Sequence, residues 1–268
     1  MAPVPPDLDP LCRLAVELAR GAGALISAGR AESGGQVAVK STPTDVVTAM
    51  DLASECYLAA ELARLRPDDA VLGEEGFRKE GTSGVRWIVD PIDGTVNYLY
   101  GIPAYAVSVA AEVRGVVSVG AVYNPASGEL FQATLGGGAW CGGQRLRCSS
   151  ESDLGQALIS TGFSYDAERR REQAAVLATL LPRIRDVRRM GSAALDLCQV
   201  AAGRLDGHYE EGLAPWDHAA GGLIAAESGA VVAGLRGQPA GPDCLVSAGP
   251  ALFPRLVAEL EALIPPPG

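Results

Sequence analysis

The chain has 268 residues, of which 48% are hydrophobic, and a net charge of −10. This length supports one large domain with a substantial core. The excess of acidic residues argues against nonspecific binding to nucleic acid or to an anionic membrane. We find no signal-peptide pattern and no apolar run of transmembrane length, and we expect a cytoplasmic protein. The six cysteines are scattered without a CxxC pair, so we expect small buried hydrophobes rather than disulfides.

The first part of the chain shows the pattern of an α+β fold. Helical spacing predicts helices over residues 8–30 and 44–66, the second beginning at a Thr44-Asp45 cap and stopped by Pro67. Short apolar runs then predict strands separated by Gly- and Pro-containing turns, and the later ones form an antiparallel meander. The expected strands are residues 71–73, 87–89, 105–113, 116–123 and 129–134. The Gly-rich stretch 136–143 lacks the GxxxxGK[ST] pattern and is better interpreted as a hairpin than as a phosphate loop.

From residue 156 onwards strands and helices alternate, which is typical of α/β structure. The expected strands are 157–161, 186–190, 207–210, 231–233 and 244–247, and the expected helices are 169–181, 193–202, 216–228 and 250–263. We therefore divide the chain into an α+β half, residues 1–155, and an α/β half, residues 156–268. No linker separates them, so we expect one folding unit.

The stretch WIVDPIDGTVNYLYGIP, residues 87–103, contains several of the candidate functional residues. Asp90 and Asp93 follow an apolar strand and are separated by a turn that Pro91 stiffens. Gly94 permits close backbone approach, and Thr95 can cap a following helical turn. A lone DPxDG is equally well explained as an ordinary solvated turn. Amides at such a turn attract phosphate, however, and carboxylates beside a phosphate need a cation between them, which favours magnesium.

Three further acidic residues stand at the ends of predicted elements. Glu74 follows a short strand in the sequence GEEG, and Asp51 lies near the start of the second helix. Asp217 falls in the first turn of a helix that Pro215 opens. Acidic residues in first turns are ordinary partners of the helix dipole, so this bland interpretation stays open. We assign no catalytic role to the only histidines, His208 and His218.

Two of these segments resemble the signatures of a known family. WIVDPIDGT and, about 120 residues later, WDHAAG followed by AESGA are similar to the two signatures of the inositol monophosphatase family of magnesium-dependent, lithium-sensitive phosphatases. Tyr98 stands where the first signature often has phenylalanine. The resemblance implies a layered αβαβα sandwich of the inositol monophosphatase and fructose-1,6-bisphosphatase type, and a homodimer.

The resemblance also implies roles for individual residues. Two or three Mg²⁺ ions would be held by Glu74, Asp90, the carbonyl of Ile92, Asp93 and Asp217. Glu74 and Thr95 would help to activate a water molecule that Asp51 helps to position. Substrate contacts would come from Asp93, Gly94, Thr95, Gly191, Ser192, Ala193, Glu210 and Asp217. A loop lysine, Lys40, would border the site.

We expect the chain to hydrolyse a phosphate monoester of a small polyol, with inositol 1-phosphate as the first choice of substrate. The same fold and metals would also suit histidinol phosphate, fructose 1,6-bisphosphate or a nucleotide 3′-phosphate. A regulatory protein that binds transcription machinery is the alternative from another class. Neither direct nucleic-acid binding nor membrane association is expected.

Overall fold

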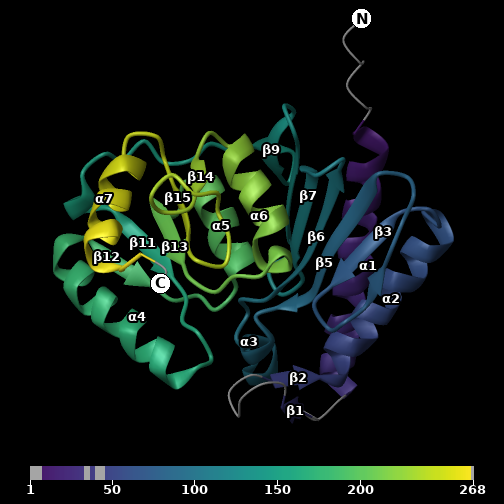
Figure 1. The fold of residues 1–268 in the computed structure, drawn as a ribbon. Coiled ribbons are helices and arrows are strands. Elements are labelled where there is room, and N and C mark those ends of the chain that lie inside the picture. Colours follow the sequence, from purple (N-terminus) through teal and green to yellow (C-terminus); the bar gives the residue numbers. More distant parts are fainter. Residues whose placement is uncertain (1–7, 33–36, 40–45, 267–268) are drawn as a thin grey trace, which may run out of the picture.

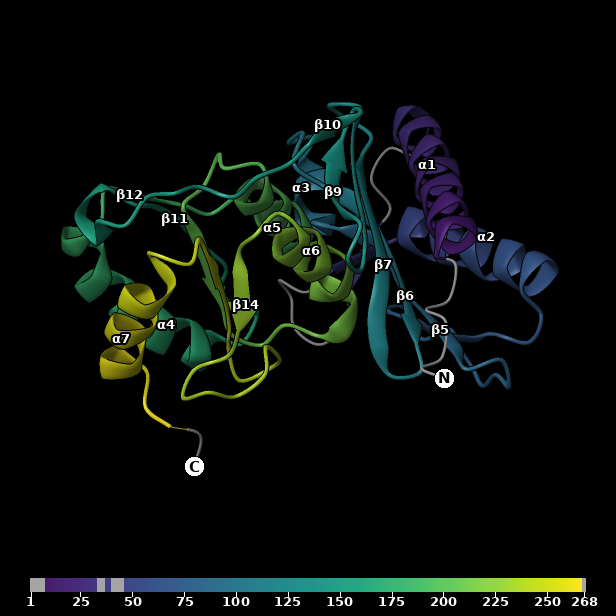
Figure 2. The ribbon, with the colours of Figure 1, turned by 90° about the horizontal axis from the view of Figure 1, so that it is seen from above.

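The computed structural model describes residues 8–32, 37–39 and 46–266 (Figure 1). The predicted cap at Thr44 and Asp45 and the loop residue Lys40 lie outside these residues. Two β-sheets alternate with three layers of helices, as Figures 1 and 2 show from two directions. This arrangement confirms the predicted αβαβα sandwich. Among the described residues, no helix is long and apolar enough to cross a membrane.

The first sheet has eight strands in the order β10-β9-β8-β7-β6-β5-β3-β4. From β5 to β10 each strand pairs antiparallel with the next, which confirms the predicted meander and hairpin. Strand β3 instead runs parallel to β5, so the C-terminal ends of these two strands meet at one edge. The strands are β3 Ala70–Gly73, β4 Arg78–Lys79, β5 Val85–Asp93, β6 Ala106–Val113, β7 Val116–Asn124, β8 Glu129–Thr134, β9 Gly138–Cys141 and β10 Gln144–Arg145.

The second sheet has five strands in the order β12-β11-β13-β15-β14. Strand β11 runs parallel to both of its neighbours, whereas β15 runs antiparallel to β13 and β14. The strands are β11 Leu158–Thr161, β12 Asp186–Arg188, β13 Gly207–Glu210, β14 Val231–Ala233 and β15 Leu245–Ala248. A separate two-stranded sheet joins β1 Val37–Val39 to β2 Val46–Thr48.

The helices form an outer, a central and a second outer layer (Figure 2). Helices α1 and α2 cover one face of the first sheet, α5 and α6 lie between the two sheets, and α4 and α7 cover the far face of the second. The bounds are α1 Asp9–Glu32, α2 Ala49–Leu65, α3 Thr95–Tyr100, α4 Ala167–Leu180, α5 Ala193–Ala201, α6 Pro215–Glu227 and α7 Phe253–Leu263. Because α5 and α6 pack on both sheets, the two sheets share the central hydrophobic core. The division near residue 155 stays a prediction.

Strand β5 shows why the first sheet is buried on both faces. Trp87 and Val89 pack with α1 and α2, whereas Ile88 between them packs with α5 and α6. Successive side chains of a strand point to opposite faces, so an unbroken apolar run fits a strand that helices cover on both sides. The next residue on the face of Ile88 is Asp90, which therefore points towards the central helix layer.

The structure corrects three local predictions. The second helix begins at Ala49 rather than at residue 44, because residues 46–48 form a strand and Thr48 is the helix cap. Strand β5 covers Val85–Asp93 instead of the predicted residues 87–89. None of the six cysteines forms a disulfide, but only Cys198 and Cys244 are buried, and Cys56 is exposed.

Strand β7 and helix α6 approach each other unusually closely at Gly120. A Cβ atom built at Gly120 would lie 2.8 Å from the carbonyl oxygen and 3.1 Å from the Cα atom of Ala220. Both are backbone atoms, so they cannot move aside as a flexible side chain can. The absence of a side chain at Gly120 therefore sets how closely α6 lies on the first sheet.

We predict that Gly120→Ala lowers the free energy of unfolding by about 1–3 kcal/mol, because the added methyl group overpacks this contact. Gly222→Ala in helix α6 is the matched control. A Cβ atom at Gly222 would have its nearest neighbouring atom, in the side chain of Val232, at 3.8 Å. Alanine should there stabilise α6 by roughly 0.5–1 kcal/mol. Denaturant titration of both variants measures the difference, and equal stabilities would show that the close approach is not a constraint.

Candidate active site

The end of strand β5 brings two carboxylates to one side of the sheet. Residues three apart on a regular strand point to opposite faces. The pairing of β5 with β6 shifts register between Asp90 and Asp93, and this irregularity removes the alternation. Both side chains are buried, at 1% and 9% exposure. The backbone amide of Ile92 donates to Asp90 Oδ1 at 3.0 Å and so fixes that carboxylate within the turn.

A left-handed glycine ends the strand and begins helix α3. Gly94 has φ = 93°, and a Cβ atom there would lie 3.0 Å from the carbonyl oxygens of Ala104 and Gly191. Glycine is thus required both by conformation and by space. Gly94 occupies the cap position, so the expectation that Thr95 caps the helix was wrong. The Thr95 hydroxyl instead lies 2.9 Å from Asp51 Oδ1 and 3.0 Å from the Ile92 carbonyl oxygen.

Asp51 connects the start of helix α2 to this turn. Its other oxygen, Oδ2, accepts from the backbone amide of Thr48 at 2.8 Å and from the Thr48 hydroxyl at 2.5 Å. The Thr48 hydroxyl also accepts from the amides of Met50 and Asp51, which completes a capping box. Asp51 is fully buried, and burial raises its pKa, although the two threonines oppose this. It is therefore both a helix cap and a fixed acceptor behind Thr95.

Glu74 follows strand β3 at the edge where β3 and β5 end side by side. A glutamate of helix α2 holds this turn. Glu55 accepts from the backbone amide of Glu75 at 2.7 Å and from that of Phe77 at 2.8 Å. The Gly73 amide closes the turn by donating to the Phe77 carbonyl at 2.8 Å. The carboxylate of Glu74 interacts with that of Asp90.

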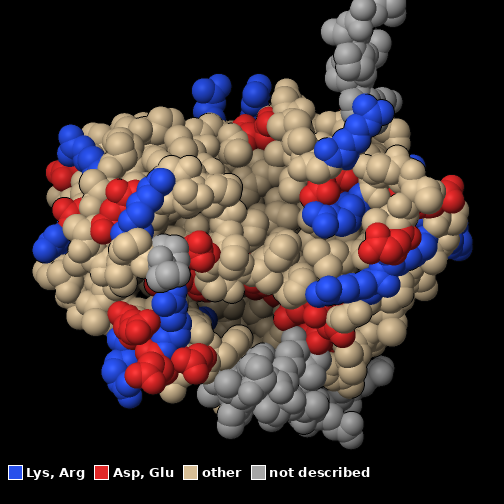
Figure 3. Space-filling model, viewed as in Figure 1, with Lys and Arg blue, Asp and Glu red and all other residues tan. Residues whose placement is uncertain are grey.

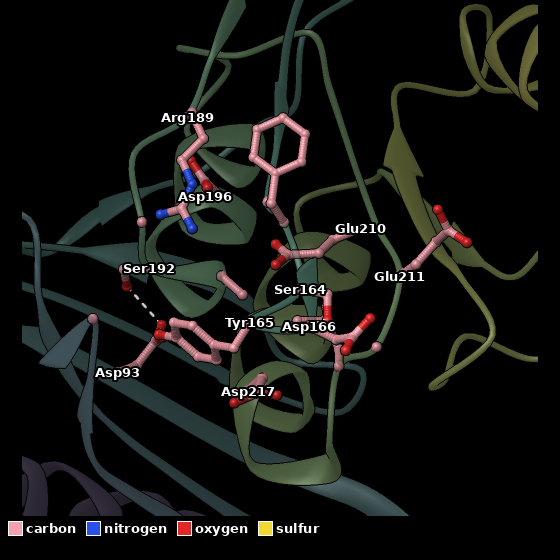
Figure 4. Close-up of a pocket in the computed structure, with 17 residues that line it drawn as sticks. Asp93, Ser164, Tyr165, Asp166, Arg189, Ser192, Asp196, Glu210, Glu211 and Asp217 are labelled. Carbon is pink, nitrogen blue, oxygen red and sulfur yellow. Dashed lines mark hydrogen bonds between the residues drawn. The ribbon is translucent and has the colours of Figure 1, made fainter. Parts of the chain in front are cut away.

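Two segments of the second half of the chain complete the site. Ser192 and the amide of Ala194, at the start of α5, donate to Asp93 Oδ2 at 2.6 and 2.7 Å. In the first turn of α6, Asp217 Oδ2 accepts from the backbone amide of Ala214 at 2.6 Å. Figure 4 shows Asp93 at the end of β5 and Asp217 on helix α6 facing the same space. Each carboxylate is oriented through one oxygen by these bonds.

A cavity of about 350 Å³ lies where the end of β5 faces the first residues of α5 and α6. Figure 3 shows this face hollowed, with acidic side chains at the bottom of the hollow. Most of the predicted substrate contacts line the cavity: Asp93, Gly94, Gly191, Ser192, Ala193, Glu210 and Asp217. The remaining candidates are not part of its wall: Asp51, Glu74, Asp90, Ile92 and Thr95. These five residues lie behind the cavity wall and are connected to it by the contacts described above.

Burial and mutual repulsion disfavour the charged forms of these carboxylates. Burial, with the charges of Glu74, Asp93 and Asp217, holds the pKa of Asp90 well above its usual range. Burial raises the pKa of Asp93 to about 6 against the hydrogen bonds that it accepts. The pKa of Asp217 is raised by burial and by Asp93. Acidic groups that destabilise one another in this way favour a bound cation.

The donor set fits a hard divalent cation, since its side chains offer only carboxylate oxygen. As the side chains stand in the described part of the chain, no three His, Cys, Asp or Glu residues are placed to hold a metal ion. Magnesium tolerates such a sparse arrangement, because it usually keeps several waters and takes one or two carboxylates together with substrate phosphate. The residues therefore fit magnesium better than a metal that needs a complete protein cage.

Several wall residues were missed by the sequence analysis. The loop after β11 contributes Phe163, Ser164 and Tyr165, and Asp196 of α5 and Glu211 after β13 also line the cavity. The loop could have been found from topology: β11 is parallel to β13, so its C-terminal end reaches the edge where Glu210 stands. Asp196 had no such signal, because a lone acidic residue inside an apolar helix pattern has no assigned partner.

Comparisons with known proteins show which sequences the chain resembles. The profile of the inositol monophosphatase family matches residues 7–264. The chain is 49% identical to an inositol-1-monophosphatase of Mycobacterium leprae over 96% of both chains. It is also 39% identical to Nus factor SuhB of Escherichia coli, over 86% of this chain and 87% of that one.

Solved structures show the same architecture. SuhB of Mycobacterium tuberculosis superposes with a TM-score of 0.84 at 44% identity, over 96% of this chain and 98% of that one. An inositol monophosphatase of Thermotoga maritima superposes with a TM-score of 0.87 at 30% identity, over 96% and 98%. The fold is thus that of a class of phosphatases. The chain belongs to the inositol monophosphatase family.

We predict that Glu55→Ala frees the turn that carries Glu74, because two backbone amides lose a charged acceptor. The loss should cost on the order of 2–3 kcal/mol and speed hydrogen exchange at the amides of Glu75 and Phe77. Glu61→Ala is the control on the same helix, where the solvent-exposed pair with Arg64 at 2.5 Å contributes little to stability and the exchange rates at Glu75 and Phe77 should not change. Unchanged exchange in Glu55→Ala would refute the anchoring role.

Proposed function

We propose that the chain hydrolyses a phosphate monoester with the help of bound magnesium. The observation that carries this proposal is the clustering of four carboxylates, in which Asp93 and Asp217 line the cavity and Asp90 and Glu74, at the ends of β5 and β3, interact with them from behind its wall. These side chains, with the Ile92 carbonyl, would hold two or three Mg²⁺ ions. When bound, magnesium supplies Lewis-acid stabilisation of the phosphate oxygens and lowers the pKa of water.

The residues of the chain then have distinct tasks. The Thr95 hydroxyl proton is directed at Asp51 or at the Ile92 carbonyl, so its oxygen lone pairs are free to accept a hydrogen bond from an attacking water. Glu74 would take the proton of that water, and Asp51 holds Thr95 in place. The first amides of α3, at Gly94 and Thr95, have no acceptor within the helix and would bind phosphate oxygens.

The charge of the cavity wall favours a substrate with one phosphate. Among the described residues that line it, acidic side chains outnumber the one basic side chain, Arg189. A second phosphate would lie among carboxylates, and like charges a few ångströms apart repel strongly where water is partly excluded. Hydroxyl groups find acceptors in Glu210 and in the segment 191–193. These features support a phosphorylated polyol, with inositol 1-phosphate as the proposed substrate.

We predict that Asp93→Asn lowers turnover by about 100-fold or more, because the side chain loses the charge that would hold magnesium. The asparagine oxygen can still accept from Ser192 and Ala194, so the fold should persist. Phosphate release and a thermal melt measure the two effects. Asp186→Asn, on the exposed strand β12, is the control and should be as active as the wild type. If Asp93→Asn turned over substrate at a rate close to that of the wild type, Asp93 could not be a magnesium ligand needed for activity.

Phosphate release from four substrates tests the choice of substrate: inositol 1-phosphate, histidinol phosphate, fructose 1,6-bisphosphate and adenosine 3′,5′-bisphosphate. We expect inositol 1-phosphate to be fastest, the two bisphosphates to be at least about tenfold lower in kcat/KM, and chelator to abolish all activity. Faster release from histidinol phosphate would keep the chemistry and change the substrate. Release that persists in chelator would contradict the role of magnesium.

A second candidate function is supported by the relatives that are named Nus factor SuhB. In that case the chain would bind transcription machinery. Binding to purified RNA polymerase with its elongation factors tests this, and Asp93→Asn should bind as the wild type does because its fold is kept. A folded chain without phosphatase activity in magnesium would leave binding as the function to pursue. The homodimer and the lithium sensitivity stay predictions, which sedimentation velocity and inhibition by Li⁺ test.

A further inference from the structure

The side chain of Asn97 connects helix α3 to the segment that leads into helix α5. The sequence analysis gave no role to this residue, although it stands in the stretch 87–103. Asn97 is buried, at 8% exposure, and its Nδ2 atom lies 2.7 Å from each of two backbone carbonyl oxygens. One oxygen belongs to Ala104, in the loop after α3, and the other belongs to Met190, which is 93 residues away in the chain.

The two partners fix the orientation of the side-chain amide. A carbonyl oxygen can only accept a hydrogen bond, so the NH₂ group of Asn97 faces both oxygens and uses one hydrogen on each. A side chain that lacks two donor hydrogens on one atom cannot make both bonds. Because the site is buried, a carbonyl that lost its donor would not regain one from bulk water without some opening of the structure. Asn97 therefore forms a bridge between two segments that are distant in the sequence.

Close backbone packing surrounds this bridge. A Cβ atom built at Gly191, where φ is 90°, would lie 2.7 Å from Nδ2 of Asn97. A Cβ atom built at Gly94 would lie 3.0 Å from the carbonyl oxygens of Gly191 and Ala104. The turn at Gly94, the asparagine amide and the backbone of Gly191 are thus packed against one another with no room for a further side chain. A shift of one of them requires the others to move.

The segment that leads into α5 is held at two points. Near its end, the Ser192 hydroxyl and the Ala194 amide donate to Asp93, and Figure 4 marks the bond from Ser192. At its start, the bridge from Asn97 holds the carbonyl of Met190. Asp93 is also a proposed magnesium ligand, whereas Asn97 carries no charge and lies outside the cavity wall. The attachment through Asn97 is therefore the one that does not involve a metal ligand.

We propose that Asn97 is a positioning residue that sets the distance between the turn at Gly94 and the segment 191–193. The inference rests on the proposed function, in which the turn binds phosphate and the segment binds hydroxyl groups. A fixed distance favours a substrate whose hydroxyl group stands at the matching distance from its phosphate, as on a rigid polyol ring. A phosphate ester without hydroxyl groups is indifferent to this distance. Asn97 would thus determine specificity without touching the substrate.

Hydrogen exchange tests the bridge without reference to activity. Asn97→Ala removes both donors, so the segment should open more often and the amide of Ala194 should exchange about tenfold faster or more. Asn124→Ala is the matched control, because Asn124 is also buried, at 6% exposure, and its Nδ2 donates to the Pro103 carbonyl in the same loop at 3.2 Å. Exchange at Ala194 should be unchanged in the control. Unchanged exchange in Asn97→Ala, or an equal acceleration in both variants, would overturn the proposal.

Kinetics of the same variants test the consequence for substrate. Inositol 1-phosphate carries hydroxyl groups on its ring, whereas p-nitrophenyl phosphate carries none. We expect Asn97→Ala to lower kcat/KM for inositol 1-phosphate about tenfold or more, chiefly by raising KM, and to lower that for p-nitrophenyl phosphate less than about threefold. Asn124→Ala should leave the ratio of the two values as it is in the wild type. Equal losses on both esters in Asn97→Ala would contradict the positioning role.

A milder variant covers the case in which Asn97→Ala does not fold. Asn97→Ser keeps one donor hydrogen, so it can bond at most one of the two carbonyls and should show the same selective loss on inositol 1-phosphate. A folded Asn97→Ser with the selectivity of the wild type would contradict the proposal. A wild type that is inactive on both esters would refute the proposed function and with it the role in specificity. The exchange rates at Ala194 would still decide whether Asn97 holds the segment.

Discussion

The structure depends on one unfavourable interaction, the burial of several carboxylates beside one another. Asp90, Asp93 and Asp217 repel each other in a site that is largely closed to water, and this shows in the raised pKa of each. Such an arrangement persists only where the fold holds the side chains in place. The amides of Ile92, Ala194 and Ala214 do this by fixing one oxygen of each carboxylate. In the proposed function, the repulsion that remains would be the driving force for taking up a cation.

The layered fold is what brings these amides into position. Asp93 belongs to the first sheet, but its hydrogen-bond donors belong to α5, and Asp217 belongs to α6. The central helices must therefore lie at a fixed distance from the first sheet. Gly120 sets part of this distance, because its backbone touches that of Ala220. Packing less than one helical turn beyond Asp217 thus controls how closely Asp217 approaches the end of β5, and this links the core to the candidate site.

Much of this arrangement could be predicted from the sequence. Apolar runs and their spacing gave most strands and helices within a few residues, and the two signatures identified the family. What could not be predicted were features that depend on contacts between distant segments. The register shift that turns Asp90 and Asp93 to one side exists only because β6 pairs with β5. Similarly, nothing in the sequence distinguishes Glu55 from other helix residues, and only the structure shows that it accepts hydrogen bonds from the turn that follows Glu74. Local patterns contain no information on either contact.

The same limit applies to the second sheet. The sequence analysis assigned no catalytic role to His208, and strand pairing places its ring between Ser160 and Ser247, two residues before Glu210 on the same strand. The cavity wall combines Asp93 and Asp217 with Glu210, which lies at the end of β13. A phosphorylated polyol would match this division, since its phosphate would need a cation and its hydroxyl groups need only hydrogen-bond partners. The position of Glu210 would then be a property of the second sheet, separate from the carboxylates of β5.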